Sequence, residues 1–426
     1  MSRPDPMSIP FSDFGKRLRS PAIASLMSAA LHDPDLLSLA AGFTDSSSLP
    51  VTAIGRAVRR LEERSGPPDH LQYGTNQGRP GLRRLLAGRI AALDGLGEKE
   101  ADPDRVLVTN GSQQALYLAT SVLCDPGDIV MVERPSYFVY LDMLRGKGAR
   151  ILDLPECEEG RLDLEAFGSL LAKLEASGEI RRVKIVYLES YFSNPTGLSR
   201  TVEEKEGLAR VLAERGVRPV VIEDAAYRDL YFEEPFPATS VLALSAFGSM
   251  PCLYLGTLTK PYASGLKTGF GICSAPELLQ RMLWLKSHHD FGTANFNQSL
   301  LEEILLEGGL DPQMAILRHK YRLKMEALDD ALRSEGLDGL GWVWAKPLGG
   351  IYLWLRAPVG LDTRTDSAFW QACLEEKVIY VPGDLCYGDR PSSGRVRLSF
   401  GVLSPDQLAD AASRFARAAR KVAVPA

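Results

Sequence analysis

Short, continuously apolar runs alternate with helix-like segments between residues 70 and 275 of the chain. In the segment 82–93, leucine and isoleucine side chains recur at helical spacing and fall on one face. The apolar runs contain almost no polar residue, as expected of strands that helices cover on both faces. These runs lie at residues 105–108, 128–132, 183–188, 219–227, 252–256 and 268–273. The alternation predicts an α/β layer with a mostly parallel central sheet flanked by helices.

The pattern changes after about residue 315. A charged segment at 313–335 predicts a long helix, and residues 341–357 predict a β-hairpin. Ser404 and Pro405 have the composition of a helix N-terminus and predict a final helix. This mixture is typical of a second, smaller α+β domain. We therefore expect three parts: an N-terminal segment (1–48) that packs on the small domain, a large domain (49–312) and the small C-terminal domain (313–426).

The composition argues against several classes of protein. Charged residues make up 24% of the chain and the formal net charge is −5, so no basic surface for nucleic acid or anionic lipid is expected. No apolar run approaches the ~20 residues that span a bilayer, and the N-terminus lacks the features of a secretory signal. No cysteines have Cys-x-x-Cys spacing, and no histidine–carboxylate spacing indicates a metal site. We expect a cytoplasmic protein with reduced thiols that binds no metal, nucleic acid or membrane.

Polar side chains follow several of the predicted strands. Open α/β sheets bind ligands beyond the carboxyl ends of their strands, so these positions are candidates for a site. Gly111 and Ser112 lead from the first strand into a helix, and a helix N-terminus favours an anion such as phosphate. Asn194 stands in the turn SNPTG, and Asp224 ends an apolar strand three residues before Tyr227. Each feature also has a structural explanation: helix capping, an Asx turn and a buried ion pair.

The stretch LGTLTKPYASGLKTGF at residues 255–270 adds two lysines, Lys260 and Lys267. A phosphate corner, a fixed amide, a carboxylate, a phenol and a lysine are thereby expected at one edge of the sheet. This set matches the needs of pyridoxal 5′-phosphate (PLP). That cofactor has a phosphate, a ring nitrogen, a phenolic oxygen and an aldehyde that forms an imine with a lysine.

Seven motifs occur in the order known from one enzyme family: LQYGTNQGRPGLR, TNGSQQAL, RPSY, SNPTG, EDAAY, the lysine stretch and RLSF. With these motifs the chain resembles, over nearly its whole length, the class I/II aminotransferases of the aspartate aminotransferase superfamily, which are fold-type I PLP enzymes. Its likeness is greatest to the subgroup that contains 2-aminoadipate aminotransferases. The resemblance implies a homodimer that moves an amino group between an α-amino acid and a 2-oxo acid.

The resemblance also implies a role for each matched residue. Lys260 would form the imine with PLP and, once released, would move the proton at the substrate Cα. Asp224 would pair with the ring nitrogen, while Asn194 and Tyr227 would contact the phenolic oxygen. Arg397 would bind the substrate α-carboxylate, next to Asn194 and Gly42. The remaining cofactor contacts are the stacking residue Tyr137 and the phosphate-side residues Gly111, Ser112, Gln113, Thr257, Thr259, Lys267 and, from the neighbouring subunit, Tyr73.

The chain departs from the family pattern around the phosphate. Lys267 replaces an arginine, and a lysine neutralises a phosphate without offering the planar fork of a guanidinium. Thr257 and Thr259 replace a pair of serines and keep the hydroxyl groups. Arg395 is an alternative to Arg397 as the residue that binds the substrate carboxylate, because residues two apart in a strand lie on the same face.

Two other functions remain open from the sequence. Eliminations, cyclisations and oxidations share the PLP chemistry of transamination, so the alternative is another PLP reaction on an amino acid. The domain could also sense an effector within a transcription regulator. We expect no winged-helix module for such a role, because the resemblance begins near the N-terminus. The sequence does not identify the substrate pair.

Overall fold

A seven-stranded sheet forms the centre of the molecule in the computed structural model, which describes residues 9–21, 33, 35–97, 101–157, 160–389 and 391–422. The strand order is β2-β8-β7-β6-β5-β3-β4. All neighbouring strands are parallel except β8, which runs antiparallel to β2 and β7. The strands are β2 (Val106–Asn110), β3 (Ile129–Val132), β4 (Arg150–Asp153), β5 (Val183–Glu189), β6 (Val220–Asp224), β7 (Cys252–Thr257) and β8 (Thr268–Cys273). The mostly parallel sheet predicted from the apolar runs is confirmed.

Helices cover both faces of this sheet, which explains why its strands are apolar at nearly every position. In β3, Val130 packs with the helices of one face, whereas the next residue, Met131, packs with those of the other. The first face carries α5 (Gly111–Leu123), α6 (Phe138–Lys147) and α9 (Pro276–His289), and the second carries α7 (Leu164–Ala176) and α8 (Val202–Glu214). The sequence pattern missed β4, since charged residues at both ends leave it only two apolar positions.

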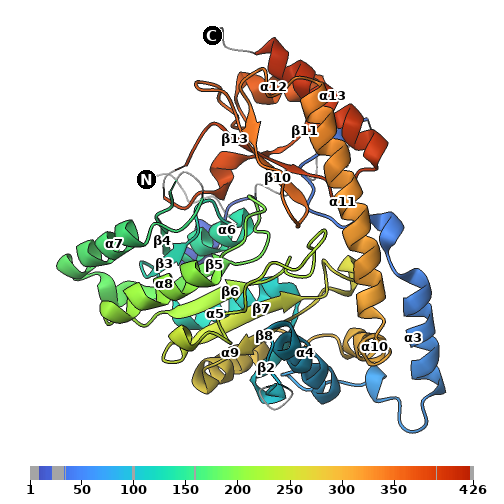
Figure 1. Ribbon diagram of the computed structural model, residues 1–426. Coiled ribbons are helices and arrows are strands. Elements are labelled where there is room, and N and C mark those ends of the chain that lie inside the picture. The colour runs from blue at the N-terminus through green and yellow to red at the C-terminus, as the bar shows by residue number, and fades with distance from the viewer. Residues whose placement is uncertain are drawn as a thin grey trace.

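The C-terminal elements form a separate group above the large sheet in Figure 1. Their antiparallel sheet has the order β12-β13-β10-β9, and the predicted hairpin is present as β9 and β10. Ser404 caps the last helix by accepting a hydrogen bond from the Gln407 N–H, as the sequence predicted. The elements are α11 (Leu310–Ser334), β9 (Val343–Trp344), β10 (Tyr352–Arg356), α12 (Ala368–Glu375), β11 (Val378–Ile379), β12 (Val381–Pro382), β13 (Arg395–Ser399) and α13 (Pro405–Lys421).

The helix α11 joins the two groups and runs from α10 (Asn295–Leu306) to α13 (Figure 1). Two further helices, α3 (Val51–Glu63) and α4 (Pro80–Leu93), pack against α10. No helix in the described part of the chain is both long and apolar enough to cross a bilayer.

The N-terminal segment touches both groups of elements. Its strand β1 (Leu37–Ser38) pairs in parallel with β11 of the C-terminal group. Its helix α1 (Asp13–Arg17) instead contacts α6, where the Arg17 guanidinium donates a hydrogen bond to the Gly146 carbonyl oxygen at 3.1 Å. The domain limits predicted at residues 48 and 312 stay predictions.

Candidate active site

The carboxyl ends of β5, β6 and β7 and the N-terminus of α5 surround a cavity. This arrangement follows from the parallel sheet, which brings the ends of its strands to one edge. The residues predicted from the sequence that line it are Gly111, Ser112, Gln113, Tyr137, Asn194, Asp224, Tyr227, Thr257, Thr259, Lys260 and Lys267. An adjoining cavity shares Lys260 and Asn194 with the first and adds Gly42 and Arg397. The structure thus brings together residues from position 42 to position 397.

The corner at the N-terminus of α5 has the features of a phosphate site. The N-cap residue Asn110 makes no side-chain capping bond, so the first backbone N–H groups of the helix remain available to an anion. A side chain at Gly269 in β8 would overlap the Gly111–Ser112 peptide, so only glycine allows this close approach. The Thr259 hydroxyl is buried and has no hydrogen-bond partner among the described residues. This corner therefore offers donors to an anion.

Asp224 is a buried carboxylate at the end of β6. It accepts hydrogen bonds from the Ala226 N–H and the Tyr187 hydroxyl, both at 3.0 Å. Burial raises the pKa of Asp224 to about 6, although these two hydrogen bonds oppose the rise. It forms no ion pair within the described part of the chain. A cation placed beside Asp224 would relieve the cost of burying this charge.

Lys260 lies just beyond the end of β7, where its amine donates a hydrogen bond to the Gly42 carbonyl oxygen. Burial, together with the positive charges of Arg397 and Lys267, lowers the pKa of Lys260 to about 8. An amine with this pKa is partly neutral near physiological pH, so it is suited to nucleophilic attack and proton transfer.

Arg397 is brought into the cavity by β13 and is only 1% exposed. Its guanidinium donates to the Asn194 amide oxygen and to the Ala40 carbonyl oxygen, each at 2.7 Å. Its Nε has no partner among the described residues. A buried guanidinium with a free donor is suited to binding a carboxylate. The alternative residue Arg395 lines neither cavity.

Tyr73 does not join the other predicted residues. Its side chain is 81% exposed and lies edge-on to Phe291, with ring centroids 5.8 Å apart. Asn295 holds this segment by donating to the Gln72 carbonyl oxygen at 2.9 Å. The contact predicted from Tyr73 to a neighbouring subunit stays a prediction.

Comparisons with known proteins agree with the chemistry of the cavity. The family described as aminotransferase class I and II matches residues 34–415. The chain belongs to this family. A 2-aminoadipate transaminase from Thermus thermophilus is 32% identical to this aminotransferase over 409 residues, which cover 95% of this chain and 96% of the relative.

Two solved aminotransferase structures have the same fold as this aminotransferase. A kynurenine aminotransferase from Pyrococcus horikoshii, in complex with PMP, has a TM-score of 0.87 at 27% identity, covering 97% of this chain and 98% of that one. The α-aminoadipate aminotransferase LysN from Thermus thermophilus, complexed with N-(5′-phosphopyridoxyl)-L-leucine, has a TM-score of 0.81 at 31% identity, covering 96% and 97%. The protein is a PLP-dependent aminotransferase of fold type I, and the alternative PLP reactions are not favoured.

The described residues of the aminotransferase fit its cofactor. The corner with the unpartnered Thr259 hydroxyl is suited to a phosphate, and Asp224 is a buried carboxylate that lacks a cation. Lys260 supplies an amine with a lowered pKa at the same cavity. The phosphate, the pyridine nitrogen and the aldehyde of PLP need these three kinds of group, in this order.

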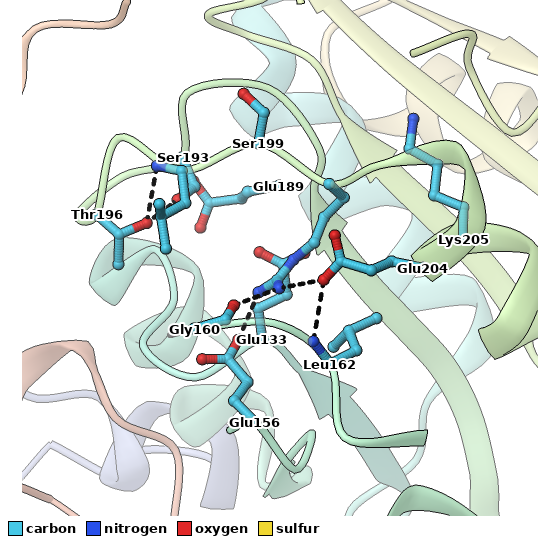
Figure 2. A network of polar contacts seen from close by, with 12 residues as sticks. Glu133, Glu156, Gly160, Leu162, Glu189, Ser193, Thr196, Ser199, Glu204 and Lys205 are labelled. Atoms are coloured by element: carbon cyan, nitrogen blue, oxygen red, sulfur yellow. Dashed lines mark hydrogen bonds and ion pairs between the residues drawn. The ribbon is translucent and has the colours of Figure 1, made fainter. Parts of the chain in front are cut away.

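A network of buried charges anchors the loop that carries Asn194. The Arg200 guanidinium donates to Glu133 at 2.9 Å, to Glu204 at 3.1 Å and to Glu156. Figure 2 shows these three glutamates gathered beneath the loop, where Ser193 and Thr196 also contact each other. Because a buried charge must be paired, the network fixes one end of the loop to strands and helices of the large sheet.

Sequence reasoning missed two residues of the aminotransferase site. Glu189 ends β5 and accepts hydrogen bonds from the Tyr137 N–H at 2.7 Å and the Asn194 N–H at 3.0 Å. The rule that identified Asp224, a carboxylate at the end of an apolar strand, would have found it. Tyr352 lies within hydrogen-bond distance of Tyr227, and no sequence signal distinguishes it from a core aromatic residue.

Proposed function

We propose that the transamination takes place at this cavity, with Lys260, Asp224 and Tyr227 as its catalytic side chains. When bound, PLP supplies the electron sink for the bonding pair of the substrate Cα–H bond. The convergence of these three side chains on one cavity carries this proposal. The lowered pKa of Lys260 supports it, because a partly neutral amine can accept the Cα proton at neutral pH. A solvated lysine, with its ordinary pKa, would be almost fully charged there.

The other site residues hold the reactants. Asp224, buried and without an ion pair in the described part, would hold a proton on the cofactor's ring nitrogen. Asn194 accepts from Arg397 through its oxygen, which leaves its NH₂ group as a donor toward the phenolic oxygen. Tyr137 would cover the ring.

The phosphate would be held by residues that lie around the N-terminus of α5 and after β7, namely Gly111, Ser112, Gln113, Thr257, Thr259 and Lys267. The substrate α-carboxylate would bind to Arg397, beside Gly42 and Asn194.

A single-turnover experiment tests the reaction class. PLP-loaded enzyme is mixed with a panel of α-amino acids in the absence of a 2-oxo acid, and the keto product is quantified. Transamination yields one equivalent of 2-oxo acid per site, because the amino group stays with the enzyme until a second substrate removes it. Release of ammonia or peroxide, with more than one equivalent of keto product per site, would contradict this function.

We propose a homodimer in which Tyr73 reaches the phosphate side of the partner's site. Tyr73 and Leu71 are both exposed in the single chain, Leu71 to 71%. Exposed apolar side chains of this kind support a contact with a second subunit at this surface. Co-expression of Lys260→Ala and Tyr73→Phe chains tests the arrangement. A mixed dimer contains one site with both native residues, so it should be more active than either variant alone. An equal or lower activity would contradict a shared site.

We also propose the cytoplasm as the location of the enzyme. All six cysteines are free thiols, which suits a reducing compartment. Recovery of the enzyme outside the cytosolic fraction of fractionated cells would contradict this location.

A further inference from the structure

One aromatic side chain, Tyr352, contacts three residues of the proposed site. It is the first residue of β10 and is 2% exposed. Its hydroxyl oxygen lies 3.0 Å from that of Tyr227, and its ring centroid lies 4.2 Å from the guanidinium carbon of Arg397. A Cβ at Gly42 would stand 2.6 Å from the Tyr352 oxygen, so Tyr352 packs closely against Gly42. The carbonyl oxygen of Gly42 is the one that accepts the hydrogen bond from the Lys260 amine.

The direction of the hydrogen bond between the two phenols follows from a count of protons. Each neutral phenol has one hydrogen to donate. If Tyr227 donates its hydrogen to the phenolic oxygen of the cofactor, it can only accept from Tyr352. Tyr352 would then be the donor of the pair. Hydrogen bonds in such a chain polarise one another, so the bond that Tyr227 donates becomes stronger.

The ring of Tyr352 acts on a different partner. Its face lies next to the Arg397 guanidinium, in a region where both side chains are buried. A cation over an aromatic face is attracted by the ring quadrupole, and the attraction is larger where water is excluded. The Phe138 ring, whose centroid lies 5.3 Å from the guanidinium carbon, is a second aromatic neighbour of Arg397. Together with Asn194 and the Ala40 carbonyl, the rings fix the orientation of the guanidinium.

We propose that Tyr352 is a positioning residue of the transamination site, whose hydroxyl directs the Tyr227 phenol toward the cofactor and whose ring holds Arg397 for the substrate carboxylate. This inference rests on the roles proposed above for Tyr227 and Arg397. One side chain from the C-terminal sheet would thereby couple the cofactor side of the cavity to its substrate side. The titratable groups near the two phenols include Arg397, Tyr137, Glu189 and Cys386, and Lys260 lines the same cavity.

Tyr352→Phe isolates the contribution of the hydroxyl, since it keeps the ring. The readout is the pH midpoint of the absorption spectrum of the bound cofactor, which does not depend on turnover. A hydrogen bond donated to the phenolic oxygen of the cofactor stabilises the deprotonated form of the cofactor. Weakening the bond that Tyr227 donates should therefore raise the midpoint by roughly half a pH unit. Tyr380→Phe is the matched control, because it removes a buried hydroxyl that donates to the Thr363 carbonyl at 2.8 Å, outside both cavities.

Tyr352→Met tests the ring, because it fills much of the volume without an aromatic face. The KM of the amino acid should rise about 5- to 30-fold, which corresponds to the ~1–2 kcal/mol of a desolvated cation–π contact. In Tyr352→Phe the KM should stay within about twofold of the native value. Far-UV circular dichroism and the PLP content show whether each variant is folded and loaded. If the methionine variant fails this check, the KM of Tyr352→Phe alone decides the point: a rise above about fivefold overturns the role of the ring.

Tyr227→Phe separates this inference from the function on which it rests. It should raise the spectral midpoint by more than Tyr352→Phe, and the double variant should show no further shift, because both substitutions interrupt one chain of hydrogen bonds. A midpoint that moves in Tyr227→Phe and not in Tyr352→Phe overturns the role of the Tyr352 hydroxyl alone. A midpoint unmoved by Tyr227→Phe contradicts the contact proposed for Tyr227, and this inference with it. An unchanged KM in a folded Tyr352→Met overturns the role of the ring.

Discussion

The protonation of the Lys260 amine can be measured in the cofactor-free enzyme through its reaction with PLP. Burial and two nearby cations lower the pKa of this amine from 10.5 to about 8. A shift of this size makes the neutral form about 300-fold more abundant at pH 7 than in a solvated lysine. The neutral fraction then amounts to roughly one tenth, against about 0.03% at the ordinary pKa.

Only the neutral amine attacks an aldehyde, so the rate of PLP attachment should follow this fraction. At sub-saturating PLP the second-order rate constant should rise about tenfold between pH 7 and pH 9 and level off above the pKa of Lys260. Stopped-flow absorbance measures the rate. The range begins at pH 7 because a phosphate monoester titrates near pH 6. Lys260→Ala measures the background reaction of surface lysines.

Arg397→Met provides the perturbation that tests the cause. It removes one of the two cations that depress the pKa of Lys260, so the pH midpoint of the attachment rate should move upward. A rate that keeps rising tenfold per pH unit up to pH 9.5 would mean that Lys260 titrates as a solvated lysine. That result would refute the reasoning, as would a midpoint that moves downward in Arg397→Met.

Three further outcomes follow from the site and its supports. Lys267→Ala should weaken PLP binding about 10- to 100-fold in equilibrium dialysis, while kcat at saturating PLP changes less; Lys267→Arg should retain binding. An unchanged affinity in the alanine variant would place Lys267 outside the site. Asp224→Asn should lower kcat at least ~100-fold, because a neutral amide cannot hold a proton on the ring nitrogen; a loss below threefold would refute that role. Arg200→Met should cost about 3–5 kcal/mol of unfolding free energy in urea titrations, because it leaves buried carboxylates without their partner. The control Arg364→Met breaks an exposed pair and should cost less than ~1 kcal/mol, and equal losses would contradict the network's importance.

Residues that follow a strand could be located from the sequence, whereas contacts between distant strands could not. Asp224 ends its strand, and Asn194 and Lys260 follow theirs within five residues. A parallel sheet must bring such positions to one edge. The same rule applied to VKIVYLE would have identified Glu189. The contact between Tyr352 and Arg397 depends on the register of β10 and β13, in which Trp354 lies opposite Arg397. Neither local composition nor spacing specifies that register.

The two sides of the cavity come from different groups of elements. The cofactor side is formed by strand ends of the large sheet, whereas Arg397 and Tyr352 belong to the C-terminal sheet. The segment that contains Gly42 belongs with the C-terminal side, because the backbone of Leu39 is hydrogen-bonded to Ile379 and Ser399. Arg397 also donates to the adjacent Ala40 carbonyl. Substitutions that shift the C-terminal sheet should therefore displace the substrate-binding groups as one unit. The residues that would hold the phosphate and the ring of the cofactor should stay in place.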